Sequence, residues 1–139
     1  MPTPYESAQI LLKLYDLRRE PVLREARKWW LTDFTPETID EFAKMVTGEH
    51  NAYYRMVAGY WDMAASFVTF GAVDPGMFRA ANGEIMATTS RIFPFLAQMR
   101  ERNKMPEFYA HAEKFVRGQP DGVDRMEMLR QRFLANKKR

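Results

Sequence analysis

The hydrophobic pattern of this chain is dominated by one long apolar segment in its middle. Residues 52–73 read AYYRMVAGYWDMAASFVTFGAV, in which Arg55 and Asp62 are the only charged side chains. The less apolar residues of this segment recur every three or four positions, which places them on one narrow stripe of a helix. A helix that is apolar on nearly all of its other sides must be enclosed by neighbouring elements. We therefore predict a central buried helix over residues 49–71.

Prolines and glycines divide the rest of the chain into shorter segments with a helical spacing of apolar residues. The pairs that begin at Thr3 and Thr35 are threonine followed by proline, a typical helix start, and Pro106 marks another start. Pro94 falls inside a helical pattern over residues 85–102, where it should kink or split the helix. No segment alternates between apolar and polar residues for long enough to predict a strand.

The predicted fold class is all-α, a single-domain bundle of about seven or eight helices around the central helix. At 139 residues the chain suits one compact domain, and it is long enough to bury a core without a disulfide or a metal. We assign the domain to residues 1–136. The basic residues 137–139 are expected to form a frayed tail.

The polar stripe of the central helix provides the first candidate site. It carries four polar side chains, Arg55, Asp62, Ser66 and Thr69. If the stripe lines a cavity, Arg55 would hold an anionic head group, and the other three side chains would orient a ligand in an apolar, aromatic pocket. Alternatively, the stripe faces water or pairs with an arginine of a neighbouring helix, such as Arg91 or Arg100. We favour the second interpretation, because ion pairs on packed helices far outnumber binding sites.

Two adjacent tryptophans, Trp29 and Trp30, are the candidate interface residues. Neighbouring positions on a helix diverge by about 100°, so both rings are not expected to point deep into the same core. One of them would then lie at a groove or a subunit contact, where tryptophan is energetically favoured. The alternative is that neighbouring helices cover both rings.

Composition narrows the chemistry that the chain can support. There is no cysteine, which excludes disulfides, thiolate nucleophiles and cysteine-based metal sites. The two histidines, His50 and His111, lack the clustered partners of a metal site. No nucleophile elbow or phosphate loop occurs. We therefore predict no catalytic residues, no metal and no cofactor.

The start of the chain and its charge pattern bear on location and partners. The first residues have no basic start before their apolar positions, so they do not resemble a signal peptide, and the longest uncharged apolar run is too short to span a membrane. We expect a cytoplasmic protein without membrane contact. The net charge of +3 combines an acidic middle with a basic end, an asymmetry that could orient a partner or a second copy of the chain.

Part of the sequence resembles a pattern in known proteins. Residues 60–78, YWDMAASFVTFGAVDPGMF, and residues 92–100, IFPFLAQMR, are similar to segments of short bacterial helical proteins of unknown function. In that pattern an aromatic-rich helix ends in a turn of glycine, two hydrophobic residues and aspartate. A later helix carries a phenylalanine or proline pair and an arginine. The resemblance implies an all-helical fold and a bacterial origin, and it brings no catalytic residues.

Three functional hypotheses follow. The first is a non-enzymatic helical protein that acts through protein–protein contact, with itself as a homodimer or with another protein. The second is a binder of a small apolar or anionic ligand. The third and weakest is nucleic-acid binding through a basic C-terminal helix. The arginines on which it rests are Arg117, Arg125, Arg130 and Arg132.

Overall fold

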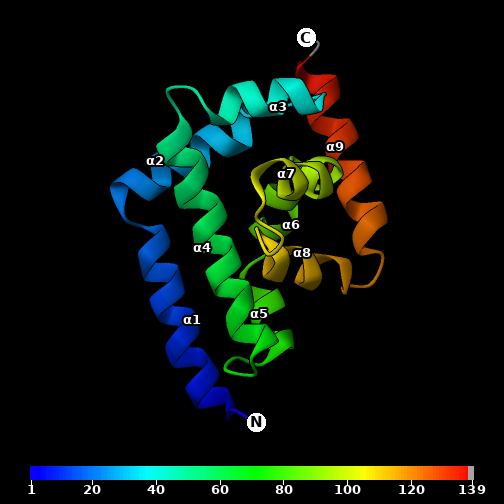
Figure 1. Cartoon of the computed structure of the whole chain (residues 1–139). Helices are drawn as coiled ribbons and strands as arrows, with labels where there is room; N and C mark the ends of the chain where they lie inside the picture. Colours follow the sequence, from blue (N-terminus) through cyan, green and yellow to red (C-terminus); the bar gives the residue numbers. More distant parts are fainter. Residues whose placement is uncertain (138–139) are drawn as a thin grey trace.

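The computed structural model describes residues 1–137 and confirms the all-α fold. These residues form nine α-helices and one 3-10 turn, and none of them belongs to a strand. Residues 138–139 of the expected tail lie outside the described part of the chain, whereas Lys137 is the last residue of the final helix. Figure 1 shows the order of the helices. Their bounds are α1 Pro4–Arg18, α2 Pro21–Thr32, α3 Ile39–Val46, α4 Asn51–Thr69, α5 Pro75–Ala81, α6 Glu84–Ser90, α7 Leu96–Asn103, α8 Ala110–Arg117 and α9 Gly122–Lys137, with the 3-10 turn at Phe93–Phe95.

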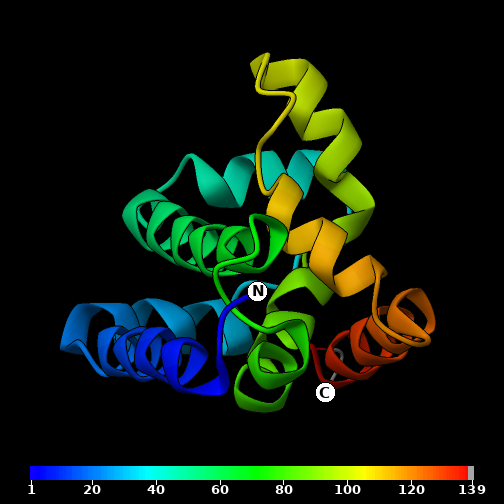
Figure 2. The same ribbon diagram turned by 90° about the horizontal axis from the view of Figure 1, so that it is seen from below.

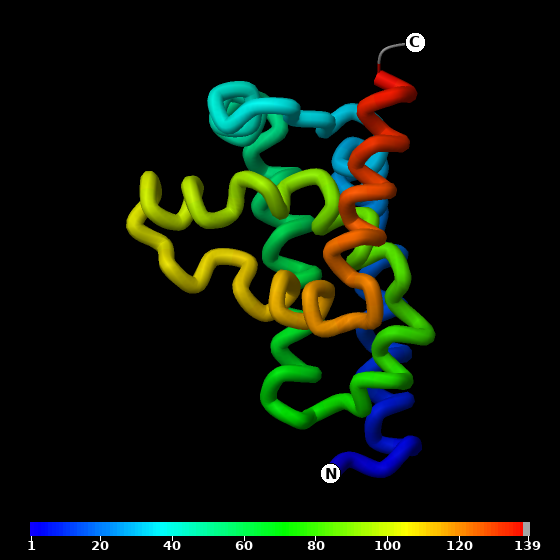
Figure 3. Tube along the Cα trace, turned by 90° about the vertical axis from the view of Figure 1, so that its right-hand side faces the viewer, coloured from blue at the N-terminus to red at the C-terminus, as the bar shows by residue number. Residues whose placement is uncertain are grey.

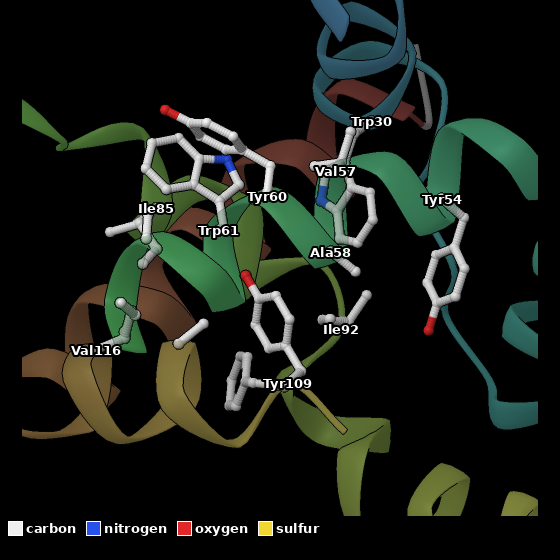
Figure 4. Close-up of a cluster of buried hydrophobic side chains, with 14 of the residues drawn as sticks. Trp30, Tyr54, Val57, Ala58, Tyr60, Trp61, Ile85, Ile92, Tyr109 and Val116 are labelled. Atoms are coloured by element: carbon white, nitrogen blue, oxygen red, sulfur yellow. The ribbon is translucent and has the colours of Figure 1, made fainter. Parts of the chain in front are cut away.

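The core forms around α4, as the apolar segment predicts. Its main neighbours are α2 and α8, and Figure 1 shows α4 passing through the middle of the molecule. Figure 4 shows side chains from α4 interleaved with those of other elements in one cluster. The indoles of Trp30 and Trp61 have no exposed surface within it. Removal of this apolar surface from water is the main force that holds the helices together.

One side of α4 is open to solvent, so the enclosure is less complete than the sequence indicates. The exposed residues recur at steps of three or four positions, and they are Ala52, Arg55, Gly59 and Met63. This line includes apolar residues, and it diverges from the predicted polar stripe beyond Gly59. Asp62 and the polar residues that follow it are half-buried instead.

The connection between α2 and α3 differs from its prediction. The pair Thr35 and Pro36 does not start a helix, because Thr38 is the N-cap of α3 and its hydroxyl accepts a first-turn N–H at 3.1 Å. The carbonyls of Thr35 and Pro36 instead accept hydrogen bonds from Lys137 and Arg130 of α9, both at 2.8 Å. A helix distant in sequence therefore satisfies the backbone of this segment.

Pro94 has the predicted effect on the long helical pattern of residues 85–102. The pattern is divided into α6 and α7, which flank the 3-10 turn that contains Pro94. Proline lacks an N–H and clashes with the preceding turn, so a continuous helix cannot pass through this position.

The start of α8 lies later than Pro106 indicates. The helix begins at Ala110, and the residue before it, Tyr109, has a φ of 57° in the left-handed region. This conformation is costly for a residue other than glycine. Burial offsets the cost, because Tyr109 is only 2% exposed and its hydroxyl lies 2.9 Å from the hydroxyl of Thr89.

Two buried arginines attach α9 to the rest of the molecule, along which it runs in Figure 3. Arg130 donates to the carbonyls of Pro36 and Arg91, and Arg91 donates to the carbonyls of Leu31 and Phe34 at the end of α2. Burial and the nearby charge of Arg130 lower the pKa of Arg91 to about 10. The carbonyls at the C-terminal end of α2 carry the negative end of the helix dipole, which compensates the buried charge of Arg91.

Candidate ligand-binding site

The polar stripe of α4 divides between two environments. Arg55 lies on the exposed side, whereas Asp62 and Thr69 face the first turn of α8. The hydroxyl of Ser66 donates only to the Met63 carbonyl of its own helix, at 2.6 Å. The structure therefore separates Arg55 from the three residues that were expected to share a cavity with it.

Asp62 caps α8 from outside that helix. Its Oδ1 accepts hydrogen bonds from the backbone N–H groups of His111 and Ala112, at 2.9 and 3.0 Å. The N-cap position of α8 is Tyr109, whose side chain makes no capping bond. First-turn N–H groups lack partners within a helix and carry the positive end of its dipole, so they favour a carboxylate. Within residues 1–137, Asp62 forms no ion pair with an arginine.

Arg55 lies at a pocket between α3, α4 and the arm formed by α7 and the segment after it. Its Nε donates to Oδ1 of Asn51 at 2.9 Å, and Nδ2 of Asn51 donates to the carbonyl of Val46 at 2.7 Å. This relay orients the guanidinium of Arg55. Within residues 1–137, its two terminal nitrogens form no further hydrogen bond or ion pair, so they remain available to a ligand.

The walls of this pocket, which we call the α4–α7 pocket, are largely apolar. Its volume is about 290 Å³. Val46, Tyr54 and Met99 supply its buried surface, and Phe108 and Met105 supply the wall beyond α7. Figure 2 shows that α7 and the segment after it project from the rest of the molecule.

The α4–α7 pocket is lined by two arginines, Arg55 and Arg102, and within residues 1–137 no acidic residue lines it. Nη2 of Arg102 lies 3.6 Å from a carboxylate oxygen of Asp40, but their side chains are 48% and 89% exposed. Contacts between such exposed charges are weak, so Asp40 does not neutralise the pocket. The two arginines thus give the apolar pocket a positively charged edge.

Tyr54 connects the α4–α7 pocket to the core. Its ring stacks on Trp30 with centroids 5.6 Å apart, and it lies 6.0 Å from the ring of Phe108. Burial raises the pKa of Tyr54, so its hydroxyl stays protonated as a hydrogen-bond donor. Among the described residues this hydroxyl has no hydrogen-bond partner, whereas the hydroxyls of Tyr60 and Tyr109 each have one.

Arg100 ties the outer wall of the pocket to α8. Its Nε donates to the carbonyl of Phe108, and its Nη1 contacts a carboxylate oxygen of Glu113, both at 2.8 Å. Glu113 also binds Arg117 of its own helix at 2.9 Å. Burial alone would raise the pKa of Glu113, but hydrogen bonds from Arg117 and Arg100 lower it, so the carboxylate stays ionised and holds Arg100 in place.

The chain itself covers both candidate interface tryptophans. Trp30 is fully buried, and its indole N–H donates to the carbonyl of Thr88 at 2.9 Å. Trp29 is 6% exposed and stacks on Phe34 and His50, with centroids 4.8 and 5.0 Å away. Neighbouring elements cover both rings, which is the arrangement of the alternative interpretation.

The basic C-terminal residues largely serve the fold. Arg130 is 7% exposed and bonded to carbonyls, and Arg117 is paired with Glu113. Arg125 and Arg132 are the exposed members of the set. Two exposed arginines do not form the continuous basic face that nucleic-acid binding requires, so that hypothesis gains no support from the arrangement.

The histidines lie in separate environments. His50 stacks on an aromatic ring of α2, whereas Nδ1 of His111 lies 3.2 Å from the hydroxyl of Thr69. Within residues 1–137, no three side chains of histidine, aspartate or glutamate gather in a way that could hold a metal ion.

The fold and the pocket define a small all-helical protein with an apolar cavity and a positive edge. A family model described as a domain of unknown function, DUF4760, matches residues 5–119, and the chain belongs to this family. Comparisons with curated proteins and with solved structures gave no match. Family membership agrees with the resemblance to proteins of unknown function. Across the described residues, no helix combines the length and hydrophobicity needed to cross a membrane.

Proposed function

We propose that this protein is a non-enzymatic binding domain that holds a small amphipathic anion in the α4–α7 pocket. One observation carries the proposal: an apolar cavity of about 290 Å³ is lined by Arg55 and Arg102 and, within residues 1–137, by no acidic side chain. The pocket modifies the ligand hypothesis drawn from the sequence. In this proposal Arg55 binds the anionic group, whereas Asp62, which accepts hydrogen bonds from α8, does not contact the ligand.

The positive edge favours a carboxylate over other small ligands. An arginine guanidinium presents paired N–H donors that match the two oxygens of a carboxylate, and such charge-assisted bonds are stronger than neutral ones. Arg55 is held by Asn51, so less conformational freedom is lost when it binds a ligand. A cationic ligand would meet two like charges and no compensating acid.

The interior favours an apolar body of limited size. The aromatic rings of Tyr54 and Phe108 and the flexible thioethers of Met99 and Met105 can adapt to a chain or a single ring. The cavity volume is at the lower limit of ordinary ligand pockets, which begin at about 300 Å³. A medium-chain fatty acid or a one-ring aromatic acid fits this space.

Isothermal titration with octanoate and 3-phenylpropionate tests the proposal, with octanol and 3-phenylpropanol as matched neutral ligands. We expect the acids to bind with millimolar or tighter affinity and the alcohols to bind about tenfold more weakly, a difference of about 1.4 kcal/mol. Arg55→Gln and Arg102→Gln should each weaken acid binding, and the double variant should abolish the preference for acid over alcohol.

Two further variants make the test specific to the pocket. Arg125→Gln removes an exposed arginine of α9 and should leave acid binding unchanged. Ala43→Leu adds bulk to the pocket wall and should weaken binding of acid and alcohol alike. The proposal is wrong if no acid binds at millimolar concentration, or if acids bind equally well to the Arg55→Gln, Arg102→Gln double variant.

A further inference from the structure

The exposed apolar surface of this protein is concentrated at its N-terminal end. Of eleven large hydrophobic residues that are well exposed within the described chain, six lie among residues 1–22. Three of them belong to one face of α1: Tyr5 at 73% exposure, Leu12 at 64% and Tyr15 at 55%. The largest apolar patch on the surface of a soluble protein is often a functional contact surface.

This face has the spacing of a coiled-coil seam. Tyr5, Ala8, Leu12 and Tyr15 follow one another at steps of three, four and three residues, the a and d positions of a heptad. The opposite side of α1 is already used. Ser7 and Leu14 are buried there, and the hydroxyl of Ser7 accepts the N–H of Asp74 at 3.0 Å. Figure 1 shows α1 at the edge of the molecule, with its outer side uncovered.

We infer that the outer face of α1 binds the same face of a second copy of this chain, with the two helices antiparallel. The seam is symmetric about residue 10, so a two-fold axis there places Tyr5 opposite the partner's Tyr15 and Ala8 opposite the partner's Leu12. The small residue meets the large one in the middle, which allows close approach of the helices. A two-fold contact requires a self-complementary surface of this kind.

The charges beside the seam favour the antiparallel orientation. Asp16 flanks the seam near the C-terminal end of α1, and in this arrangement it lies near the N-terminus of the partner's α1. A carboxylate is stabilised there by the positive end of the helix dipole. A parallel arrangement would place like ends of two helix dipoles together.

The same charges disfavour a lipid surface as the occupant. Helices that lie on membranes carry mostly lysine and arginine on the polar side of the apolar face. In α1, the charged residues at the two positions that flank the seam differ in sign, with Asp16 on one side and Arg18 on the other. This mixture suits a partner that carries both signs, which a second copy does.

The size of the face sets the strength of the contact. The three exposed side chains present on the order of 400 Å² of accessible surface per copy. A dimer that covers both faces buries about 800 Å² in total, which is less than the ~1,200 Å² of a stable interface. We therefore expect a reversible dimer with a dissociation constant of about 10–100 µM. The contact is independent of the α4–α7 pocket, whose residues lie on other helices.

Sedimentation velocity of the full chain, from about 5 to 500 µM, tests the self-association. The unmodified protein should shift from monomer to dimer over this range. Leu12→Glu places a charge in the middle of the seam and should raise the dissociation constant at least tenfold. Met128→Glu changes an exposed apolar residue of α9, 48% exposed, and should leave the shift unchanged. Circular dichroism and thermal melting establish that both variants fold.

Disulfide trapping tests the orientation, and the absence of native cysteine makes it clean. Ala8→Cys and Leu12→Cys proteins are mixed and oxidised. The antiparallel seam places position 8 opposite position 12 of the partner. Two copies of position 8 are instead offset by about 6 Å along the helix axis, so their Cα atoms lie beyond the ~7 Å reach of a disulfide. The mixed disulfide should therefore form at least tenfold faster than either symmetric one.

Three results would overturn the self-association. The first is a monomer at every concentration, and the second is an unchanged dimer in Leu12→Glu. The third is a monomer that binds vesicles of anionic phospholipid through a surface lost in Leu12→Glu, which would assign the face to a membrane surface instead. Faster trapping of the symmetric disulfides would reject the antiparallel arrangement.

Discussion

The carboxylate of Asp62 accepts two first-turn N–H groups of α8, and no side chain of α8 replaces it. Asp62→Ala leaves these half-buried donors unpaired, and we expect it to lower the free energy of unfolding by about 1–3 kcal/mol. Asp62→Asn keeps one acceptor oxygen and should lose about half as much. Urea unfolding followed by circular dichroism measures both. Ser66→Ala, on the same side of α4, should change the value by less than ~0.5 kcal/mol because Ser66 bonds only to its own helix.

For single residues, the sequence predicts the position on a helix but not the partner of the side chain. The spacing of Arg55 and Asp62 correctly places both on the less apolar side of α4, because helical periodicity is a local property. Their partners are not local. Asp62 binds backbone N–H groups about fifty positions later in the chain. A backbone N–H is the same donor whatever the side chain of its residue, so the sequence does not mark these partners. Met99 and Phe108, which complete the pocket beside Arg55, carry no signal that distinguishes them from ordinary core residues.

Among the elements, α9 lies beyond residues 5–119 of the family match. Its attachment to the rest of the molecule can be tested by substitution. Phe133 is 8% exposed, and the guanidinium carbons of Arg91 and Arg130 lie 4.0 and 5.4 Å from its ring centroid. Phe133→Ala should lower the free energy of unfolding by about 3 kcal/mol, since it removes a packed ring between two buried cations.

Guanidinium unfolding and amide hydrogen exchange provide the measurements for α9. Met128→Ala on the same helix should change the unfolding free energy by less than ~0.5 kcal/mol. In the unmodified protein the amides of α9 should exchange as slowly as those of α6, against which it packs. Fast exchange confined to α9 would show that this helix opens independently of the core.

Element boundaries were predictable where the signal is local and failed where tertiary contacts decide. Pro94 splits its helix because the ring and the missing N–H act on the adjacent turn. Thr35 resembles a helix cap as much as Thr38 does, and the choice depends on Arg130 and Lys137 of α9. The late start of α8 likewise depends on the burial of Tyr109, because the buried residue adopts a left-handed conformation and so lies outside the helix.

At the scale of the whole molecule, buried tyrosines set the response to alkaline pH. Burial raises the pKa of Tyr60 from its ordinary 10 to about 12, and burial also raises the pKa values of Tyr54 and Tyr109. Above pH 10 the unfolded chain releases protons that the folded chain keeps, so the stability present below pH 10 is lost as pH rises. Arg91 and Arg130 act in the opposite sense, since burial lowers the pKa of both guanidinium groups, that of Arg91 to about 10, which favours the folded state as pH rises.

Three buried tyrosines outweigh these two arginines, so we expect the free energy of unfolding to fall between pH 10 and 12. Guanidinium unfolding across this range, together with the ultraviolet absorbance of tyrosinate, provides the test. The three buried tyrosines should ionise only as the protein unfolds. Tyr60→Phe should make the decline less steep. A stability that stays constant up to pH 12 would contradict the assignment of raised pKa values to these side chains.

The projecting arm of α7 and the following segment has a consequence for how this family can diversify. Arg100 joins the arm to α8, and the arm contributes one wall of the pocket without contributing to the packing of α2 against α4. Insertions or substitutions between residues 101 and 107, which are exposed, can therefore widen, narrow or recharge the cavity while the folding core stays intact. The size and charge of the cavity and the stability of the fold are thus separable properties of this architecture, open to independent change during evolution.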